Sequence, residues 1–368
     1  MGINIYKNKK MKQETLDRQI ALGRKERLLF VCKQRHTYSD EYSKEILTSS
    51  GLYNSANFVV QELNSIGIKS KLVDVVDNND IDREVSLFKP TMVIIEALWV
   101  VPEKFDVLRR LHPNVKWVVR LHSKLPFLSG EGNAMDWVFR CAEKDNVYIG
   151  VNSIELEKDL KHVIPTSKIL YLPNVYSFPD NSGFYYQYIS GGHDVKKHLH
   201  IGGFGAIRPL KNQLMQAFAA ITYAEKKESE LTYYINSGRV EGYQSKSILK
   251  NIRDLFARFP QHKLVEVGWL DHKDFIQLVR RMDLGLQLSY SETFNIVAAD
   301  FVSNYIPFVG SSEIDWLYAP IWNIDSLEYI HAAMDIALSY EHVERSALKL
   351  KITSKENLLS WVRMLNNF

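Results

Sequence analysis

A pair of carboxylates, Glu292 and Asp300, carries the strongest chemical signal in the sequence. They follow an apolar segment at 283–291, and a helix is predicted over about 294–304. The first turn of a helix exposes unpaired N–H groups and the positive end of the dipole, which together favour an anion. The expected donors are the N–H groups of Thr293, Phe294 and Asn295. The two carboxylates can then bracket a ligand across the helix start. The same pattern also allows a structural role, with Glu292 stabilising the dipole and Asp300 solvated.

A second segment, residues 200–218, combines glycines with two cations. Gly203 and Gly205 follow an apolar strand and permit a tight turn at which the backbone approaches a phosphate closely. Arg208 and Lys211 come next, at the start of the following predicted helix. A departing nucleoside diphosphate develops negative charge, which positioned cations neutralise. The dinucleotide motif Gly-x-Gly-x-x-Gly is excluded because Arg208 occupies its third glycine position.

Alternating strands and helices must position these residues. In the first half, strands are predicted at 27–33, 69–76, 91–98, 116–123, 146–153 and 168–174, with helices that include 55–67 and 80–89. The same order restarts with strands at 197–207, 230–237, 262–270 and 283–291. Such alternation predicts parallel sheets with right-handed crossovers, whose ligands bind beyond the carboxyl ends of the strands. The expected fold class is α/β, with two Rossmann-like halves.

The alternation stops between residues 176 and 196, where Pro, Ser, Gly and scattered aromatic residues are typical of a connection. We therefore expect four regions along the chain. They are a basic leader at 1–26, a first Rossmann-like domain at 27–190, a second at 191–345 and a helical tail at 346–368.

The composition is that of a globular protein, with 46% hydrophobic and 24% charged residues among 368. No apolar run approaches the roughly 18 residues of a membrane span, and the N-terminus lacks the apolar core of a secretory signal. Two distant cysteines, Cys32 and Cys141, predict no disulfide framework. These features predict a cytoplasmic protein.

Charge is unevenly spread although the net charge is only +3. Residues 1–27 carry eight Lys or Arg against three acids. Such an arm suits peripheral contact with an anionic membrane surface or with a polyanionic acceptor. A solvated, loosely ordered leader is the commoner outcome at a chain terminus.

The segment 284–310 resembles the signature of family-four retaining glycosyltransferases: Ser, Glu, any residue, Phe, an acid eight residues after the Glu, and then a buried strand that opens with Pro. The resemblance implies a GT-B architecture, in which two Rossmann-like domains face each other across a cleft. It implies that Glu292 hydrogen-bonds hydroxyls of the donor sugar and Asp300 the nucleotide ribose. Asp300 replaces the family's second Glu, and Asn295 replaces a common Gly.

The glycine-rich segment is similar to the family's Gly-Arg…Lys-Asn segment, with Lys211 and Asn212 in register. The family's Arg beside the Gly is Ala206 here, and Arg208 is the chemical substitute that we expect. The resemblance makes 191–345 the nucleotide-sugar domain and 27–190 the acceptor domain.

Weaker matches extend the resemblance beyond these two segments. Residues 172–176 resemble the Pro-Asn-Gly-Val segment that closes the first domain, and the turn at Gly268 and Trp269 resembles the one that meets the nucleotide base. A stacking role for Trp269 competes with simple packing. In the first domain, Gly51 stands where the family has a glycine-bearing loop near the diphosphate. His122 ends a strand, as does the family's first-domain His that reaches the donor sugar.

The implied reaction is transfer of a sugar, with retention, from a nucleotide sugar to an acceptor hydroxyl. UDP- or GDP-sugars are the expected donors, as co-substrates rather than resident cofactors, and no metal is required. The acceptor stays open among a glycan, a lipid-linked sugar and a small molecule. The alternatives are a phage-type transferase acting on a DNA base, a sugar-nucleotide 2-epimerase and a non-catalytic nucleotide-sugar-binding protein.

Two possible metal sites are interpreted as local structure. Asp80 and Asp82 spell an Asp-x-Asp motif, but they open a helix, where acids are electrostatically favourable. His193, His198 and His200 lack an acid or Cys at zinc spacing.

Overall fold

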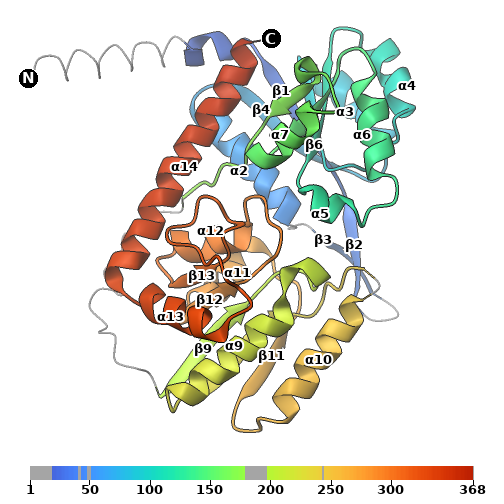
Figure 1. Cartoon of the computed structure of the whole chain (residues 1–368). Helices are drawn as coiled ribbons and strands as arrows, with labels where there is room; N and C mark the ends of the chain where they lie inside the picture. The colour runs from blue at the N-terminus through green and yellow to red at the C-terminus, as the bar shows by residue number, and fades with distance from the viewer. Residues whose placement is uncertain (1–18, 40–42, 48–50, 179–196, 243, 368) are drawn as a thin grey trace, which may run out of the picture. The chain divides into compact units, whose positions relative to one another are not determined.

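The computed structural model describes residues 19–39, 43–47, 51–178, 197–242 and 244–367. Its internal contacts divide the chain into two compact units (Figure 1). Unit 1 comprises Met1–Ser177 and Ser354–Phe368, and unit 2 comprises Phe178–Thr353. The division differs from the predicted limits because the last helix, α14 (Tyr340–Asn366), begins in unit 2 and ends in unit 1. Most of the basic leader, residues 1–18, lies outside the described residues.

Unit 1 contains a six-stranded parallel sheet with the order β4-β1-β5-β6-β7-β8. Its strands are β1 (Arg27–Lys33), β4 (Lys69–Val75), β5 (Met92–Glu96), β6 (Lys116–Leu121), β7 (Val147–Val151) and β8 (Ile169–Tyr171). Its other helices are α2 (Gly51–Ser65), α3 (Asp80–Phe88), α4 (Lys104–Leu111), α5 (Leu125–Leu128), α6 (Ala134–Ala142), α7 (Ile154–Lys161) and the 3-10 turn η1 (Thr166–Lys168).

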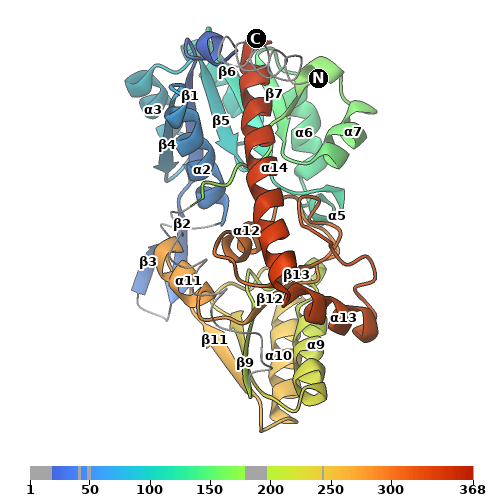
Figure 2. The same ribbon diagram turned by 90° about the vertical axis from the view of Figure 1, so that its left-hand side faces the viewer.

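Both faces of this sheet are covered, which explains why its strands are continuous apolar runs. Successive side chains of β1 point to opposite faces, so Leu29 belongs to one core and Phe30 to the other. Helices α3, α4, α6 and α7 pack on the Leu29 side. Helix α2 and the end of α14 pack on the Phe30 side (Figures 1 and 2). There the Trp361 ring lies 5.5 Å from that of Phe30, which ties the C-terminal helix into unit 1.

An antiparallel hairpin between β1 and α2 was not predicted. It pairs β2 (Arg35–Ser39) with β3 (Ser43–Leu47). Neither strand has the continuous apolar run that marks the buried strands, so local pattern did not indicate them. Helix α2 begins at Gly51, earlier than the predicted residue 55.

Unit 2 contains a five-stranded parallel sheet with the order β11-β10-β9-β12-β13. Its strands are β9 (His198–Gly203), β10 (Glu230–Asn236), β11 (Lys263–Val267), β12 (Leu284–Gln287) and β13 (Phe308–Gly310). Its helices are η2 (Pro209–Lys211), α9 (Gln213–Lys226), α10 (Ser245–Ala257), α11 (His272–Val279), α12 (Ile296–Ser303) and α13 (Leu327–Ala337).

The unit 2 sheet is also covered on both faces. Helices α9, α10 and α13 share one apolar cluster with alternate residues of β9 and β10, such as Ile201 and Tyr233. On the other side, α11 and α12 contribute Phe275 and Phe301 to an aromatic group around Phe204, with ring centroids 5.1 and 6.0 Å away. The two sheets confirm the predicted α/β class with two Rossmann-like halves.

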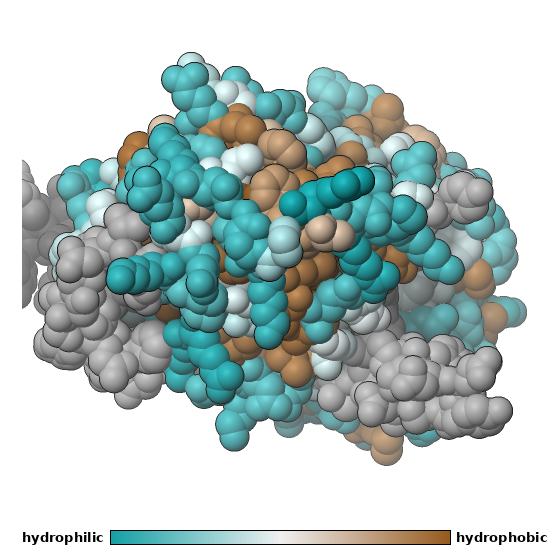
Figure 3. Space-filling model, turned by 90° about the horizontal axis from the view of Figure 1, so that it is seen from below, coloured by the Kyte–Doolittle hydropathy of each residue, from teal (hydrophilic) through white to brown (hydrophobic). Residues whose placement is uncertain are grey.

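The surface of unit 2 seen from below is mostly hydrophilic, with hydrophobic side chains gathered near its middle (Figure 3). Across the described ranges, no helix has both the length and the apolar character required to cross a membrane. Contact of the basic leader with a membrane or polyanion stays a prediction.

Candidate active site

The expected donor-site residues of unit 2 gather at the carboxyl edge of its sheet. In the order β11-β10-β9-β12-β13, strands are added on one side of β9 first and then on the other. The topological switch point therefore falls between β9 and β12, and open α/β sheets bind ligands at such points. Lys211 follows β9 and Glu292 follows β12, so the two residues lie on either side of the switch point.

Lys211 and Glu292, 81 residues apart, form an ion pair between Nζ and Oε1. The Glu292 side chain is only 7% exposed and also accepts a 2.9 Å hydrogen bond from Asn295 Nδ2. The turn that carries Lys211 is fastened to the Glu292 loop by a 2.9 Å bond from Tyr290 N to the Leu210 carbonyl. The backbone thus holds a cation and a carboxylate together at the edge where a ligand is expected.

Helix α12 begins at Ile296, so the prediction that Thr293 and Phe294 supply first-turn donors is wrong. Asn295 is the N-cap, and its side chain accepts a 2.9 Å hydrogen bond from Ala298 N. Its φ of 58° is left-handed, a conformation that favours Gly and, after Gly, Asn. This geometry explains why Asn is accommodated where the family commonly has Gly. Phe294 is instead buried against the Trp316 ring, 5.5 Å away.

Asp300 is buried, at 1% exposure, and not the solvated side chain that local pattern allowed. Its Oδ1 lies 2.8 Å from His272 Nε2, on the first residue of α11. The His272 side chain is 28% exposed, so the imidazole stands between the carboxylate and solvent. Burial disfavours the charged imidazole, but the hydrogen bond and charge of Asp300 outweigh it and raise the pKa of His272 above its ordinary value.

The raised pKa predicts a pH-dependent contribution of His272 to stability. The contribution is complete below the unfolded-state pKa of about 6.5 and is lost as pH rises through the higher folded-state pKa. His272→Gln is therefore expected to destabilise the protein more at pH 6 than at pH 8.5. Urea unfolding of variant and wild type at both values checks this, with His198→Gln as the histidine control. An equal loss at both values would contradict it.

Side-chain amides hold the loop after β9. Gly205 N donates to Asn236 Oδ1 at 2.9 Å, and Gln287 Nε2 donates to the Phe204 carbonyl at 2.5 Å. Both amide residues are buried, and they end β10 and β12, the two strands on either side of β9. Gly205 has a φ of 114°, which L side chains rarely adopt, and a Cβ there would meet open space. The backbone requirement, rather than crowding, therefore selects glycine at 205.

Gly203 is explained by packing. A Cβ at this position would lie 2.0 Å from the Tyr233 hydroxyl and 3.2 Å from Gln216 Oε1. The ring of Tyr233 is buried in the core, so the clash has no easy relief. Glycine is thus required here whether or not a phosphate binds; diphosphate contact at Gly203 and Gly205 stays a prediction.

Arg208 is part of a charged cluster with Glu241 and Arg239. Glu241 accepts from both guanidinium groups, and the Arg239 guanidinium carbon lies 5.3 Å from the centroid of the Trp269 ring. The backbone supports this cluster, because Ile207 N donates to the Arg239 carbonyl at 2.9 Å and Glu241 N donates back at 3.0 Å. Arg208 is therefore connected to the turn at Trp269 through Glu241 and Arg239.

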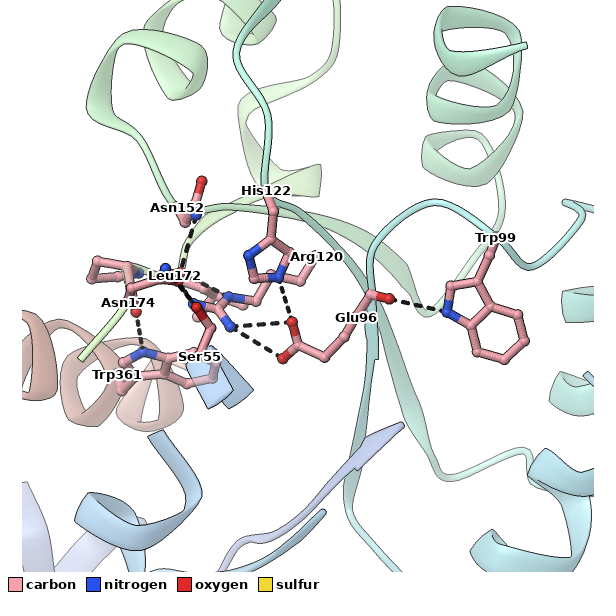
Figure 4. Close-up of polar contacts among 10 residues, drawn as sticks. Ser55, Glu96, Trp99, Arg120, His122, Asn152, Leu172, Asn174 and Trp361 are labelled. Atoms are coloured by element: carbon pink, nitrogen blue, oxygen red, sulfur yellow. Dashed lines mark hydrogen bonds and ion pairs between the residues drawn. The ribbon is translucent and has the colours of Figure 1, made fainter. Parts of the chain in front are cut away.

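In unit 1, His122 follows β6 and its Nε2 contacts Glu96, the last residue of β5 (Figure 4). Arg120 also pairs with Glu96, at 3.1 Å. Burial would raise the pKa of Glu96, but the charges of Arg120 and His122 and their hydrogen bonds lower it. Gly51 begins α2, and a Cβ there would meet no atom within 4 Å. Donor contact by Gly51 and His122 stays a prediction.

The motifs interpreted as local structure have local partners. Asp80 accepts hydrogen bonds from the backbone N–H groups of Val76 and Asp77 ahead of α3, and Asp82 lies 2.7 Å from His112. The rings of His198 and His200 stack at 4.8 Å. Among the described residues no group of His, Cys, Asp and Glu is arranged to hold a metal, and His193 lies outside them.

Several supporting residues escaped the sequence-based interpretation, and most share one signal. Glu96, Asn236 and Gln287 are each the buried polar last residue of a parallel strand. A polar residue at the carboxyl end of a parallel strand lies at the edge where open α/β sheets bind their ligands. His272 had no comparable signal, because its partner Asp300 is on another helix.

No protein-family model and no curated protein matches the sequence. Solved structures match the fold. The UDP-forming trehalose-phosphate synthase from Burkholderia xenovorans is 12% identical, with a TM-score of 0.61 over 93% of this chain and 99% of its own. The E. coli trehalose-6-phosphate protein bound with UDP-2-fluoro glucose is also 12% identical, with a TM-score of 0.64 and the same coverage. Anabaena HepE, in complex with UDP and glucose, is 11% identical, with a TM-score of 0.57 over 93% and 97%. The chain has the GT-B fold.

Proposed function

We propose that the protein is a glycosyltransferase that takes its sugar from a nucleotide-sugar donor. The observation that carries the proposal is the Lys211–Glu292 ion pair at the switch point of the unit 2 sheet. A cation there neutralises the charge that develops on a leaving diphosphate, and the carboxylate accepts hydrogen bonds from sugar hydroxyls. The fold supports the proposal, because similar structures hold UDP with glucose and UDP-2-fluoro glucose.

The proposed donor pose follows from the order of groups along the carboxyl edge. The diphosphate lies over the turn at Gly205 and against Lys211 and the start of α12. The nucleotide base lies by Gly268 and Trp269, where the aromatic ring and the neighbouring Arg239 supply a stacking surface. His272, which is partly exposed beside the buried Asp300, meets the ribose. This pose assigns the ribose contact to the His272–Asp300 pair rather than to Asp300 alone.

In the proposed reaction, the bond between the sugar anomeric carbon and the phosphate oxygen breaks as the acceptor oxygen bonds to that carbon. The acceptor proton passes to the departing phosphate. Retention follows if the acceptor attacks from the face that the phosphate leaves. We propose a hexosyl donor carried on UDP or GDP, and an acceptor hydroxyl on a glycan, a lipid-linked sugar or a small molecule.

A panel of UDP-, GDP-, ADP- and CDP-sugars in a thermal-shift assay tests the proposal. A ligand that binds only the folded state, present at 100 times its Kd, stabilises that state by about 2.7 kcal/mol. This stabilisation raises the melting temperature. At least one UDP- or GDP-sugar is expected to give a saturable shift that Lys211→Gln removes. Product analysis on that donor then separates transfer, which needs an acceptor, from epimerisation, which releases nucleotide and altered sugar without one. No shift with any sugar nucleotide would refute the proposal.

A further inference from the structure

A buried polar cluster lies at the carboxyl edge of the unit 1 sheet (Figure 4). Glu96 and Arg120, both 0% exposed, form an ion pair with Nη1–Oε distances of 3.1 and 3.2 Å. Their strands, β5 and β6, are neighbours in the sheet. His122, two residues after Arg120, contacts the second oxygen of Glu96 and keeps 15% of its side chain exposed. The cluster thus connects a fully buried ion pair with a histidine at the edge of the sheet.

The Arg120 side is anchored independently of His122. Its Nε donates to the Leu172 carbonyl at 3.0 Å, and Nη2 donates to Asn174 Oδ1 at 2.5 Å. Asn174 in turn donates to Ser55 Oγ at 3.0 Å. A buried ion pair needs such additional bonds to offset desolvation, and even then it contributes little net stability. Glu96 is therefore held rigidly by Arg120, and stability is a weak reason for the arrangement.

The backbone next to Glu96 is strained. Ala97 has a φ of 69°, in the left-handed region that costs a non-glycine residue about 1–2 kcal/mol. Two bonds impose this conformation: Ala97 N donates to the Arg120 carbonyl at 2.9 Å, and Trp99 Nε1 donates to the Glu96 carbonyl at 3.0 Å. Strain that the surroundings enforce in this way gathers at functional sites. The strain supports a role for the carboxylate beyond packing.

We propose that Glu96 is a positioning residue for His122: its carboxylate accepts the Nε2 proton and holds the imidazole so that Nδ1 is an acceptor for a hydroxyl of the sugar ligand. The identity of the ligand rests on the proposed function. The tautomer of His122 depends only on its contact with Glu96. Among the described residues, the charged groups that act on His122 are Glu96 from β5 and Arg120 from β6.

A neutral imidazole is consistent with these surroundings. Burial lowers the pKa of His122, the carboxylate of Glu96 opposes this, and the positive charge of Arg120 lowers the pKa further. The net effect is a pKa below the ordinary value. A neutral ring whose Nε2 carries the proton must have Nδ1 unprotonated.

Nitrogen NMR of the full chain labelled with ¹⁵N-histidine tests the tautomer without any ligand, and His122→Gln assigns the signal. The wild type is expected to show neutral His122 with the proton on Nε2 at pH 7. Glu96→Gln is expected to lower the pKa of His122 further, because the carboxylate that raises it is removed. A doubly protonated His122 at pH 7, or a pKa unchanged in Glu96→Gln, would overturn the proposal.

Asn174→Ala is the matched control, because Asn174 binds Arg120 as Glu96 does but has no bond to His122 among those described. It is expected to leave the His122 pKa and tautomer at wild-type values. If Asn174→Ala shifts the His122 pKa as much as Glu96→Gln does, then the role of Glu96 is merely structural. If Glu96→Gln does not fold, Glu96→Asp replaces it. Aspartate keeps a charge beside Arg120 but is one methylene shorter, so it should change the His122 signal.

Turnover of the donor found in the thermal-shift panel gives the functional readout. Glu96→Gln and His122→Gln are each expected to lower kcat/KM about 10- to 100-fold, and the double variant little further, because the two residues act as one unit. The acidic limb of the pH profile should move to lower pH in Glu96→Gln. Additive losses or an unmoved limb would count against positioning. If no sugar nucleotide turns over, the proposed function fails, while the NMR result still decides the role of Glu96.

Discussion

Replacing either Lys211 or Glu292 with glutamine is expected to lower sugar transfer at least about 100-fold, equivalent to roughly 2.7 kcal/mol of transition-state stabilisation. In the proposed mechanism Lys211 supplies the charge that neutralises the leaving diphosphate and Glu292 holds the sugar, so each loss would fall on the reacting groups. Because the residues are paired, each variant also leaves its partner partly buried without a counter-charge. Steady-state kinetics with the donor from the thermal-shift panel measures the effect.

Circular dichroism and the melting temperature should show that both variants remain folded. Lys250→Gln is the matched control, because Lys250 is an exposed residue of α10 in the same unit, paired with Asp254. That variant is expected to turn over like the wild type. The mechanistic assignment is wrong if either site variant keeps wild-type turnover. The double variant should lose no more than the worse single variant, since paired residues are not additive.

Arg120→Ala is expected to lower the free energy of unfolding by roughly 3–5 kcal/mol, more than any other variant proposed for this protein. The reason is that it leaves the Glu96 carboxylate buried without its main partner. The charge of Arg120 is one of the causes that lower the pKa of Glu96, so removing it favours the protonated acid. Urea unfolding followed by intrinsic fluorescence measures the change. The indole of Trp361, 5.2 Å from the guanidinium, reports on this part of unit 1.

Arg109→Ala tests whether the loss comes from burial. Arg109 pairs with Asp145 at 3.2 Å, but the Asp145 side chain is 92% exposed. An exposed pair contributes at most about 1 kcal/mol, so this variant should unfold close to the wild type. Equal losses in the two variants would contradict the account of the buried pair.

The two units share one local arrangement at the carboxyl edge of their sheets. In each, a polar residue ends a buried apolar strand, as with Glu96 on β5 and Gln287 on β12. Because the strands are parallel, all such residues lie at one edge of the sheet. The strand body is buried on both faces, so the polar residue is anchored by the core and presented at the edge.

Strands and helices whose limits depend only on adjacent residues could be predicted from the pattern of apolar and polar side chains. The apolar run at 27–33 was predicted as a strand and is β1, because both of its faces are buried. Helix α12 was misplaced by two residues at its start because Asn295 adopts a left-handed conformation and caps the helix. That conformation depends on its bonds to Glu292 and Gln287. Local periodicity carries no information about those bonds.

The chemical types at the unit 2 edge were readable as residues, and Lys211 and Glu292 were both expected at the donor, but the atoms that pair were not readable. The contact of Lys211 with Glu292 needs β9 and β12 to be neighbours in the sheet. The contact of Asp300 with His272 was not predicted, and it arises because α11 and α12 pack on the same side. The alternation of strands and helices, and hence the α/β class, could be read from the chain because short-range periodicity reports burial. Pairings between distant residues could not, because strand order and helix packing bring them together only in the folded protein.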